Sequence, residues 1–342
     1  MFSLARRLLF LLPPERAHDL TFATLDRYTQ LTGGLGLPKP IADPRALLGL
    51  TCRNAVGLSA GLDKNADHVL ALAALGFGFL ELGTVTPRPQ PGNPGPRLFR
   101  LPAHQALINR LGFNNLGVEH LCQRLAATRS QLDLPIGINI GKNRDTPLEQ
   151  ATQDYRHCLK AVYPFADYIA VNLSSPNTPG LRALQAGEQL VELVRALKAD
   201  QKQQTQASGR YVPLLVKIAP DLSPEALHDL VDVLMGEAID GVIATNTTLS
   251  REPVAGAKNA DEAGGLSGAP LLTMANAVVE QIRSQSGPDW PIIGAGGITQ
   301  PQDAVTKMQA GADLVQVYTG LIYQGPKLIQ QAAAAIRDQV AH

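Results

Sequence analysis

Eight short apolar runs between residues 55 and 320 limit most strongly how this chain can fold. Most of the runs are continuously apolar rather than alternating, which is typical of strands that are buried on both faces. Helical segments separate them, so that each run forms a unit with the helix that follows. Eight such α/β units predict a TIM (β/α)8 barrel. We expect the strands at 55–60, 77–85, 135–140, 167–174, 213–219, 241–247, 291–298 and 314–320.

The segments outside the eight units suggest an extension and several loops. Residues 1–45 have the leucine spacing of two short amphipathic helices, with Pro13 and Pro14 as the break between them. We therefore divide the chain into an N-terminal helical extension, 1–45, and a barrel domain, 46–342. The Pro- and Gly-rich segments 86–112 and 248–270 are long enough to be lids or binding loops. The polar stretch 201–210 is expected to be an exposed loop.

Composition excludes several classes of protein. Thirty basic residues balance thirty acidic ones, so the net charge gives no reason to expect nucleic-acid binding. Cys52, Cys122 and Cys158 are far apart and odd in number, which favours neither a disulfide framework nor a metal site and suggests a reducing cytoplasm. The apolar run after Arg6 and Arg7 is too short for a signal peptide, and no segment is long enough to span a membrane.

Polar residues or glycines occupy or follow the carboxyl ends of all eight predicted strands. Since the carboxyl ends of the strands meet at one face of a TIM barrel, these residues are expected to share a single site. They are Ala60, Gly61, Asp63 and Lys64, Gly83 and Thr84, Asn139, Asn172, Ser174, Ser175 and Asn177, Lys217, Thr245 to Thr247, Gly294 to Gly297, and Tyr318 to Gly320.

The glycine-rich segment 294–298 is a candidate phosphate cradle. Alone it would be interpreted as a tight turn. Here it follows the seventh strand and precedes a helix, so its free backbone N–H groups and the positive end of the helix dipole can bind an anion. Tyr318, Thr319 and Gly320 follow the eighth strand, and this pair of loops is the usual phosphate site of TIM barrels.

Two lysines and four asparagines supply the remaining chemistry. Lys217 is flanked by apolar residues and is expected to point into the barrel mouth, where it requires either an anionic partner or a Schiff-base role. Lys64 lies at another strand end, and the same alternatives remain open for it. An amide cluster suits a ligand with alternating C=O and N–H groups, such as a pyrimidine ring. Its members are Asn109, Asn172, Asn177 and Asn246.

The chain resembles the dihydroorotate dehydrogenase family, and specifically its class 2, quinone-dependent, membrane-associated members. The resemblance covers nearly the whole chain. It rests on AGLDKN (60–65), ELGTVTPRPQPGNPGPRLFR (81–100), INRLGFNN (108–115), GINIGKN (137–143), NLSSPNTPG (172–180), VKIAPD (216–221), GVIATNTT (241–248), GGLSG (264–268) and GAGGI (294–298).

The resemblance implies an FMN-containing barrel that oxidises (S)-dihydroorotate to orotate in de novo pyrimidine biosynthesis. It implies that FMN is bound by Ala60, Gly61, Leu62, Asp63, Lys64, Thr84, Asn139, Asn172, Lys217, Thr245, Gly268, Gly297, Tyr318 and Thr319. It implies that the substrate is bound by Lys64, Asn109, Arg110, Leu111, Gly112, Phe113, Asn172, Asn177, Asn246 and Thr247.

The segment NLSSPNTPG contains no histidine or acid that could activate a serine. The resemblance implies that Ser175 is nevertheless the catalytic base: it takes a proton from C5 of the substrate while a hydride leaves C6 for N5 of FMN. Thr178 and a water near Phe113 resemble the family's proton relay. Lys217 would stabilise the charge of reduced FMN. Class 1 relatives have cysteine where Ser175 stands. Ser174 is interpreted as a structural hydroxyl.

For the electron acceptor, the resemblance implies a membrane quinone. His18, Arg100 and Tyr318 match positions that line the quinone tunnel of relatives, whereas Ile322 stands where some relatives have threonine. The leucines of the N-terminal helices, with Arg6, Arg7 and Arg16 nearby, suit a helix pair lying in the membrane interface. By periodicity alone, packing of the helices on the barrel is equally consistent. The expected location is peripheral, on the cytoplasmic side of the inner membrane.

Two other hypotheses fit parts of the pattern. A Schiff-base lyase could use Lys217 in the same barrel, although the asparagine cluster gives no reason to expect one. A membrane-surface binding protein with a degenerate barrel is disfavoured because polar groups are present at every strand end.

Overall fold

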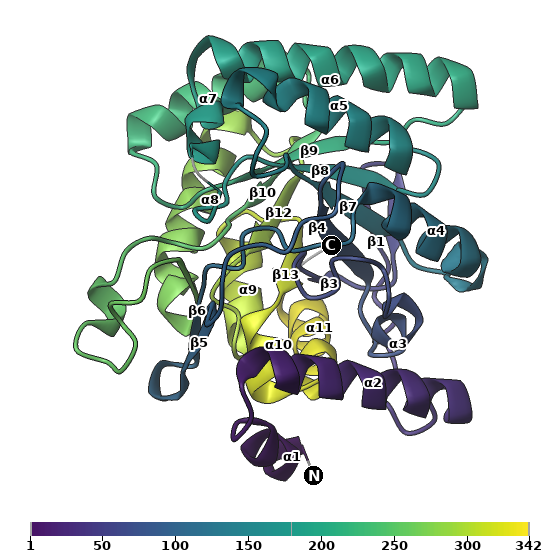
Figure 1. The fold of residues 1–342 in the computed structure, drawn as a ribbon, viewed down its shortest axis with the longest axis vertical. Coiled ribbons are helices and arrows are strands. Elements are labelled where there is room, and N and C mark those ends of the chain that lie inside the picture. Colours follow the sequence, from purple (N-terminus) through teal and green to yellow (C-terminus); the bar gives the residue numbers. More distant parts are fainter. Residues whose placement is uncertain (1, 179, 341–342) are drawn as a thin grey trace.

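A closed barrel of eight parallel strands forms the centre of the molecule (Figure 1). The computed structural model describes residues 2–178 and 180–340. Around the barrel the order is β10-β12-β13-β3-β4-β7-β8-β9. The strands are β3 (Val56–Leu58), β4 (Phe79–Val85), β7 (Ile136–Ile140), β8 (Tyr168–Asn172), β9 (Leu214–Ile218), β10 (Gly241–Ala244), β12 (Ile292–Ala295) and β13 (Leu314–Val317). All eight predicted strands and the predicted fold class are confirmed.

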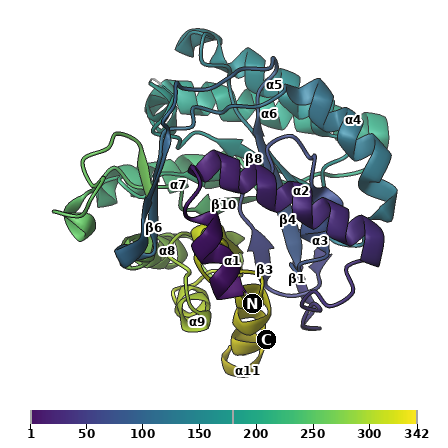
Figure 2. The same cartoon turned by 60° about the horizontal axis from the view of Figure 1, so that its bottom comes forward.

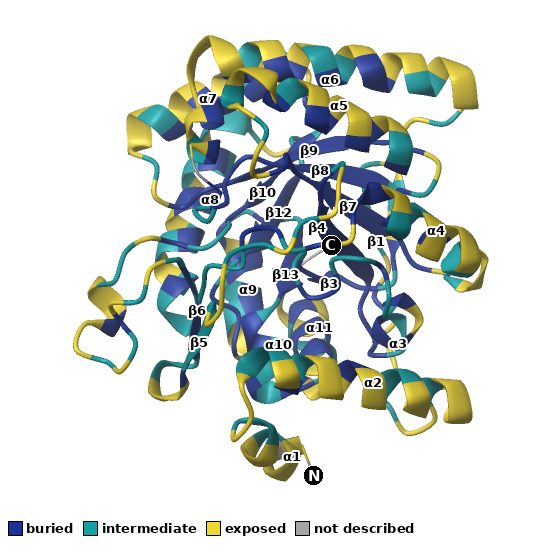
Figure 3. Cartoon of the chain, viewed as in Figure 1, coloured by how far each residue is buried: buried dark blue, intermediate teal, exposed yellow. Residues whose placement is uncertain are grey.

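Helices cover the outside of the barrel, and this explains why the strands are apolar throughout. Every residue of the eight strands is buried (Figure 3). The helices are α3 (Val69–Ala73), α4 (Val118–Thr128), α5 (Ala151–Val162), α6 (Gly187–Ser208), α7 (Pro224–Gly236), α8 (Leu272–Ser286), α9 (Pro301–Gln309), α10 (Thr319–Gln324) and α11 (Lys327–Gln339). Short 3-10 turns occupy Pro102–His104, Arg129–Gln131, Leu148–Gln150, Leu181–Gln185, Glu252–Val254 and Ala269–Leu271.

Two helices precede the barrel, as predicted. They are α1 (Phe2–Leu9) and α2 (Pro14–Thr32), and α2 is longer than expected. Pro14 starts α2, where its missing N–H costs nothing, and Gly33 ends it with φ +62°. The two helices lie on one side of the barrel, where α2 packs on α3 (Figure 2). The first helix, α1, packs on α10. A small antiparallel pair, β1 (Arg45–Leu47) and β2 (Leu50–Cys52), connects them to the barrel.

The two long connections contain strands of their own, which were not predicted. Segments of both form an antiparallel sheet in the order β11-β6-β5, with β5 at Leu98–Leu101, β6 at Ala106–Asn109 and β11 at Gly265–Gly268. Their pairing joins residues that are far apart in the chain, such as Leu107 and Ser267. A short, glycine-rich strand that depends on such a distant partner has no local pattern to identify it.

The segment 201–210 is also not a loop, since residues up to Ser208 complete helix α6. Gln, Lys and Ala are good helix formers. Gln201 is buried, and its side-chain amide donates to the carbonyl of Val212 at 2.8 Å. Within the described residues, no helix has the length and apolar character that crossing a bilayer requires.

Candidate active site

The carboxyl ends of the strands surround one cavity of about 990 Å³, including the part open to solvent. Every barrel strand except β7 contributes lining residues or is followed by them. The long connections supply the rest, including Asn109 at the end of β6 and Gly268 at the end of β11. The predicted shared site therefore exists, and the small sheet forms part of its rim.

Most of the predicted residues line this cavity. They are Ala60, Gly61, Lys64, Thr84, Asn109, Leu111, Gly112, Phe113, Asn172, Ser175, Asn177, Lys217, Thr245, Asn246, Thr247, Gly268, Gly297, Tyr318 and Thr319. Ala295, Gly296 and Ile298 of the predicted phosphate cradle also line it. The prediction missed Ser59, Pro176, Ser267, Leu271 and Gln316, which complete the lining. Leu62, Asp63, Arg110, Asn139, Thr178, His18 and Arg100 are not among the lining residues.

Asn139 and Asp63 support the lining from behind. The Asn139 side chain accepts from the Thr84 hydroxyl at 2.5 Å and from Asn172 Nδ2 at 3.2 Å, which fixes two lining residues. The Asp63 carboxylate accepts from the backbone N–H groups of Asp67 and His68 at 3.0 and 2.8 Å. Burial raises the pKa of Asp63. Asp63 thus holds the turn that presents Lys64 to the cavity.

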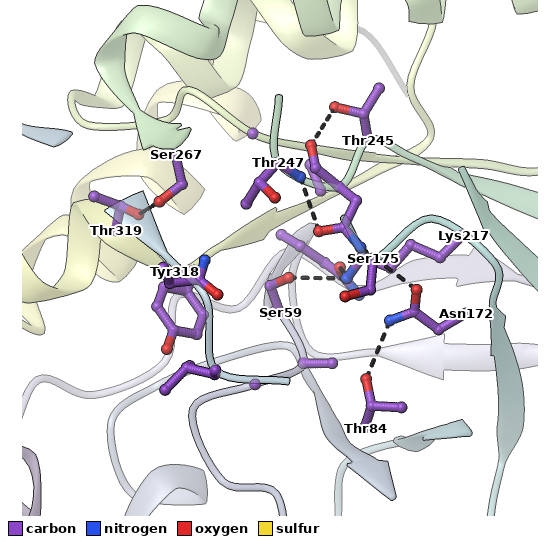
Figure 4. A pocket seen from close by; sticks show the side chains of 18 of the residues that line it. Ser59, Thr84, Asn172, Ser175, Lys217, Thr245, Thr247, Ser267, Tyr318 and Thr319 are labelled. Atoms are coloured by element: carbon purple, nitrogen blue, oxygen red, sulfur yellow. Dashed lines mark hydrogen bonds between the residues drawn. The ribbon is translucent and has the colours of Figure 1, made fainter. Parts of the chain in front are cut away.

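Lys217 has the anionic partner that its burial requires. Its ammonium lies 3.2 Å from Oε1 of Glu81 and donates to Ser59 Oγ at 3.1 Å (Figure 4). Glu81 is fully buried and also accepts from Asn139 Nδ2 at 2.9 Å, Gln316 Nε2 at 2.6 Å and the Tyr168 hydroxyl at 3.1 Å. The network fixes Lys217 as a charged group at the base of the cavity.

Glu81 was missed although the sequence holds a signal for it. It lies in the middle of the apolar run FGFLELGTV, just as Lys217 lies in the middle of PLLVKIA. Two opposite charges inside apolar strands of one barrel are expected to pair.

Lys64 is the cation of the cavity that lacks a partner. Within the described part of the chain its ammonium has no hydrogen bond or ion pair. Burial lowers the pKa of Lys64 to about 8, and the charge of Arg97 adds to this, whereas Glu15 and Asp63 oppose it. Glu15 of α2 lies 2.7 Å from Arg97. A half-buried cation without a partner is suited to an anionic ligand.

The four asparagines converge on the same space. Asn177 Nδ2 donates to Asn109 Oδ1 at 3.2 Å, and Asn246 Nδ2 donates to Asn172 Oδ1 at 3.4 Å and to Ser174 Oγ at 3.0 Å. The predicted structural role of Ser174 agrees with this bond and with its full burial. Together the amides offer donors and acceptors on opposite sides of the cavity.

Ser175 lines the same cavity as Lys217 and Asn172 (Figure 4). It is 6% exposed, and its Oγ accepts a hydrogen bond from the Asn177 backbone N–H at 3.3 Å. Thr178 is buried, and no hydrogen bond joins its hydroxyl to Ser175 within the described chain. Phe113 also lines the cavity, with φ +54°, and its carbonyl accepts from Asn115 Nδ2 at 2.7 Å.

The glycine cradle differs in one respect from the expectation. The N–H groups of Thr299 and Gln300, just before α9, are capped by the Asp303 carboxylate at 2.8 Å each. By contrast, the N–H groups of Gly297 and Ile298 have no acceptor within the described residues, and both residues line the cavity. The free N–H donors are therefore those of the glycine-rich segment, a few residues before α9, rather than those of the first turn of the helix.

The predicted quinone residues lie around the N-terminal helices. The His18 ring packs on Phe22 with centroids 4.7 Å apart, and burial lowers the pKa of His18 to about 4. Arg100 lies 4.5 Å from the Phe10 ring and donates to the Leu12 carbonyl at 2.8 Å. Tyr318 lines the cavity itself, and burial raises its pKa to about 12.

Arg110, which was expected at the substrate, is turned to a different partner. Its Nη1 is paired with Glu262 at 2.6 Å. Its guanidinium also lies 4.6 Å from the centre of the Phe99 ring. The arginine therefore ties the two long connections together rather than lining the cavity.

Comparison with known proteins agrees with this geometry. The profile of the family described as dihydroorotate dehydrogenase matches residues 45–340. A protein of Marinobacter nauticus, named dihydroorotate dehydrogenase (quinone), is 54% identical over 345 aligned positions that cover 100% of both chains. The chain belongs to the dihydroorotate dehydrogenase family. A relative from Azotobacter vinelandii with the same name is 53% identical and covers 98% of this chain and 96% of its own.

Solved structures of dihydroorotate dehydrogenase have the same fold. The Eimeria tenella structure in complex with ferulenol superimposes with a TM-score of 0.86 at 38% identity, covering 96% of this chain and 90% of its own. A ligand-free structure of the same protein gives 0.85 and covers 94% of each chain. The chain is a quinone-dependent dihydroorotate dehydrogenase of pyrimidine biosynthesis.

The ion pair of Lys217 and the family membership together decide between the three hypotheses for this chain. A Schiff-base lysine must attack as a free amine. Lys217 instead forms an ion pair with the Glu81 carboxylate. The Schiff-base lyase and the degenerate membrane-binding barrel are therefore rejected. Within the described residues no group of His, Cys, Asp and Glu could hold a metal ion.

Proposed function

We propose that the chain oxidises (S)-dihydroorotate with FMN bound in the barrel mouth and with Ser175 as the base. The observation that carries the proposal is the convergence of Ser175, Lys217, Lys64 and the asparagine cluster on one cavity. Among the described residues that line the cavity there is no carboxylate and no histidine that could act as the base instead. Glu81, which lies behind the lining against Lys217, already accepts from four donors.

The residues present fit FMN. The free N–H groups of Gly297 and Ile298 suit a phosphate, in line with phosphate binding by backbone amides elsewhere. The Thr247 Oγ is buried without a hydrogen-bond partner, which is expected of a group that awaits a ligand. We assign FMN to Ala60, Gly61, Lys64, Thr84, Asn172, Lys217, Thr245, Gly268, Gly297, Tyr318 and Thr319.

In this proposal FMN supplies the acceptor for the hydride that leaves C6 of the substrate. Ser175 Oγ takes the proton from C5 as it releases its own hydroxyl proton, and the Asn177 N–H donates a hydrogen bond that holds this oxygen in place. Lys217 supplies a fixed positive charge where the negative charge of reduction collects. The asparagine cluster orients the pyrimidine ring, and Lys64 binds the substrate carboxylate. Thr178 and Phe113 are proposed to border the path by which the proton leaves.

Anaerobic mixing tests this function directly. The purified protein should be yellow, dihydroorotate should bleach the flavin absorbance, and a quinone added afterwards should restore it. A colourless protein that cannot be reconstituted with FMN would overturn the cofactor assignment.

The role of Lys64 predicts a pH dependence of orotate binding. The free site binds the carboxylate only while Lys64 is protonated, and the pKa of Lys64 is about 8. The dissociation constant of orotate should therefore rise by about tenfold per pH unit above that value and stay flat below it. Titrations from neutral to alkaline pH measure it. Lys64→Met should bind weakly at every pH, whereas Lys202→Met, an exposed control on α6, should keep the wild-type profile.

We also propose that the N-terminal extension, residues 1–45, attaches the catalytic domain, 46–342, to the cytoplasmic face of the membrane and admits the quinone. Several leucines of the extension are strongly exposed, namely Leu4 (65%), Leu8 (61%), Leu11 (81%), Leu31 (76%) and Leu35 (78%). Figure 3 shows exposed segments on both α1 and α2. Such a group of exposed leucines on neighbouring elements is unusual for a surface that faces only water. Arg7 and Arg16 are exposed among them and suit anionic headgroups. His18, Arg100 and Tyr318 are the candidate residues of the quinone path.

Vesicle binding checks the membrane proposal. The double variant Leu8→Glu, Leu11→Glu should lower partition onto vesicles of anionic and neutral lipids by at least about tenfold, because each buried leucine contributes about 1.5–3 kcal/mol. Met235→Glu on α7, far from α1 in Figure 1, is the control and should bind like the wild type. Equal binding of all three proteins would contradict the role of the extension.

A further inference from the structure

One arginine outside the cavity joins the three loops that surround the proposed reaction site. Arg182 lies in the 3-10 turn Leu181–Gln185, which follows the loop that carries Ser175. Its Nε donates to the Ser174 carbonyl at 3.0 Å, Nη1 to Asp221 Oδ2 at 2.7 Å and Nη2 to the Thr247 carbonyl at 2.9 Å. These acceptors follow β8, β9 and β10 respectively.

Two of the three acceptors belong to or adjoin residues that line the cavity, and the third links two of the loops. Ser174 is the residue before Ser175, and Thr247 lines the cavity next to Asn246. Asp221 continues the connection, because its Oδ1 accepts from the Thr248 hydroxyl and from the Leu249 N–H. A guanidinium is a planar, rigid donor, so these three bonds fix the relative positions of the three loops.

We propose that Arg182 is a positioning residue that sets the distance between Ser175 and the substrate held beside Asn246 and Thr247. Arg182 itself does not line the cavity, so it acts on the proton transfer only through the residues that it holds. A displacement of about 1 Å between a base and its proton can cost about 10²-fold in rate. This inference rests on the proposed role of Ser175 as the base.

The test compares Arg182→Gln and Arg182→Lys by anaerobic stopped-flow reduction of the FMN-loaded protein. Arg182→Gln should lower the limiting rate of reduction by about 10²-fold, whereas the orotate dissociation constant should change by less than about tenfold. Arg182→Lys keeps the positive charge but cannot donate to three acceptors in the guanidinium plane, so it should recover only part of the rate. The control is Arg195→Gln on α6, which removes a 66% exposed arginine paired with Glu237 and should leave the rate unchanged.

A double-mutant cycle separates positioning from general loss of structure. When Arg182→Gln is combined with Ser175→Ala, it should cost no more than about threefold further, because there is then no base to position. A loss of the same size in both backgrounds overturns the inference, as does a single variant with the wild-type rate. If Arg182→Gln does not fold, Asp221→Asn breaks the same clamp from its other side and is measured in the same cycle.

The outcomes for Ser175 and Arg182 are distinguishable. If Ser175→Ala reduces at the wild-type rate, the proposed base is wrong and the role of Arg182 falls with it. If Ser175→Ala is slow and Arg182→Gln is fast, only the present inference is overturned.

Discussion

Ser175→Ala is expected to slow the reduction of bound FMN by dihydroorotate by about 10²–10⁴-fold, the usual contribution of a positioned general base. The serine hydroxyl is small and makes only one bond to the Asn177 backbone, so the substitution removes the proton acceptor without opening the cavity. Orotate should bind nearly as tightly as before, because Lys64 and the asparagine cluster are intact. Stopped-flow absorbance gives the rate, and the flavin's spectral change on binding gives the orotate affinity.

The matched control for this prediction is Ser223→Ala. Ser223 caps the N-terminus of α7, where its Oγ accepts from the Ala226 N–H at 3.2 Å, and it does not line the cavity. Its loss costs about 1 kcal/mol of stability and should leave the reduction rate unchanged. Rapid reduction by Ser175→Ala would contradict the base assignment, and an equal slowing of both variants would attribute the effect to stability.

Glu81→Ala is expected to lower the free energy of unfolding by about 3–5 kcal/mol. The substitution leaves the Lys217 ammonium buried without its carboxylate and removes the acceptor for Asn139, Gln316 and Tyr168. An unpaired buried charge costs far more than the pair contributes. Urea denaturation, followed by circular dichroism, measures the loss.

Two further variants test the cause of that loss. Glu192→Ala removes an exposed carboxylate of α6 and should change the unfolding free energy by no more than about 0.5 kcal/mol. Adding Lys217→Met to Glu81→Ala removes the stranded charge and should recover part of the loss. If the double variant is less stable than Glu81→Ala by the full cost of Lys217→Met alone, the two residues are not coupled and the explanation is wrong.

The barrel could be predicted from the sequence because its strands are buried on both faces. A run such as PLLVKIA is apolar at nearly every position and needs no information about its neighbours to be recognised. The sheet of β5, β6 and β11 could not, since GLSG becomes a strand only by pairing with residues far away in the chain. Likewise, Gln201 is polar in the sequence and buried in the fold because one distant carbonyl accepts its amide.

The residues that line the cavity could be predicted from the strand pattern. The residues behind them, which hold the lining in place, could not. Residues at the carboxyl ends of parallel strands must meet, so Lys217, Asn172 and Thr245 follow from topology. Asn139 was expected at the cofactor but lies behind Thr84, because a side chain's depth in a barrel depends on packing that one sequence does not display. Arg182 gave no signal at all, since its role exists only in three carbonyl and carboxylate contacts from separate loops.

The ion pair between Glu15 and Arg97 limits which residues of α2 can be made more polar without affecting the cavity. Glu15 belongs to the helix that carries exposed leucines, yet its charge also offsets that of Arg97 beside Lys64. Replacing the exposed leucines with polar residues does not change the charges of Glu15 and Arg97 near Lys64. Replacing Glu15 as well would leave the charge of Arg97 unopposed next to Lys64 and would lower the pKa of Lys64 further. The loss of orotate affinity would then begin at a lower pH. Solubility engineering on α2 should therefore keep that one acid.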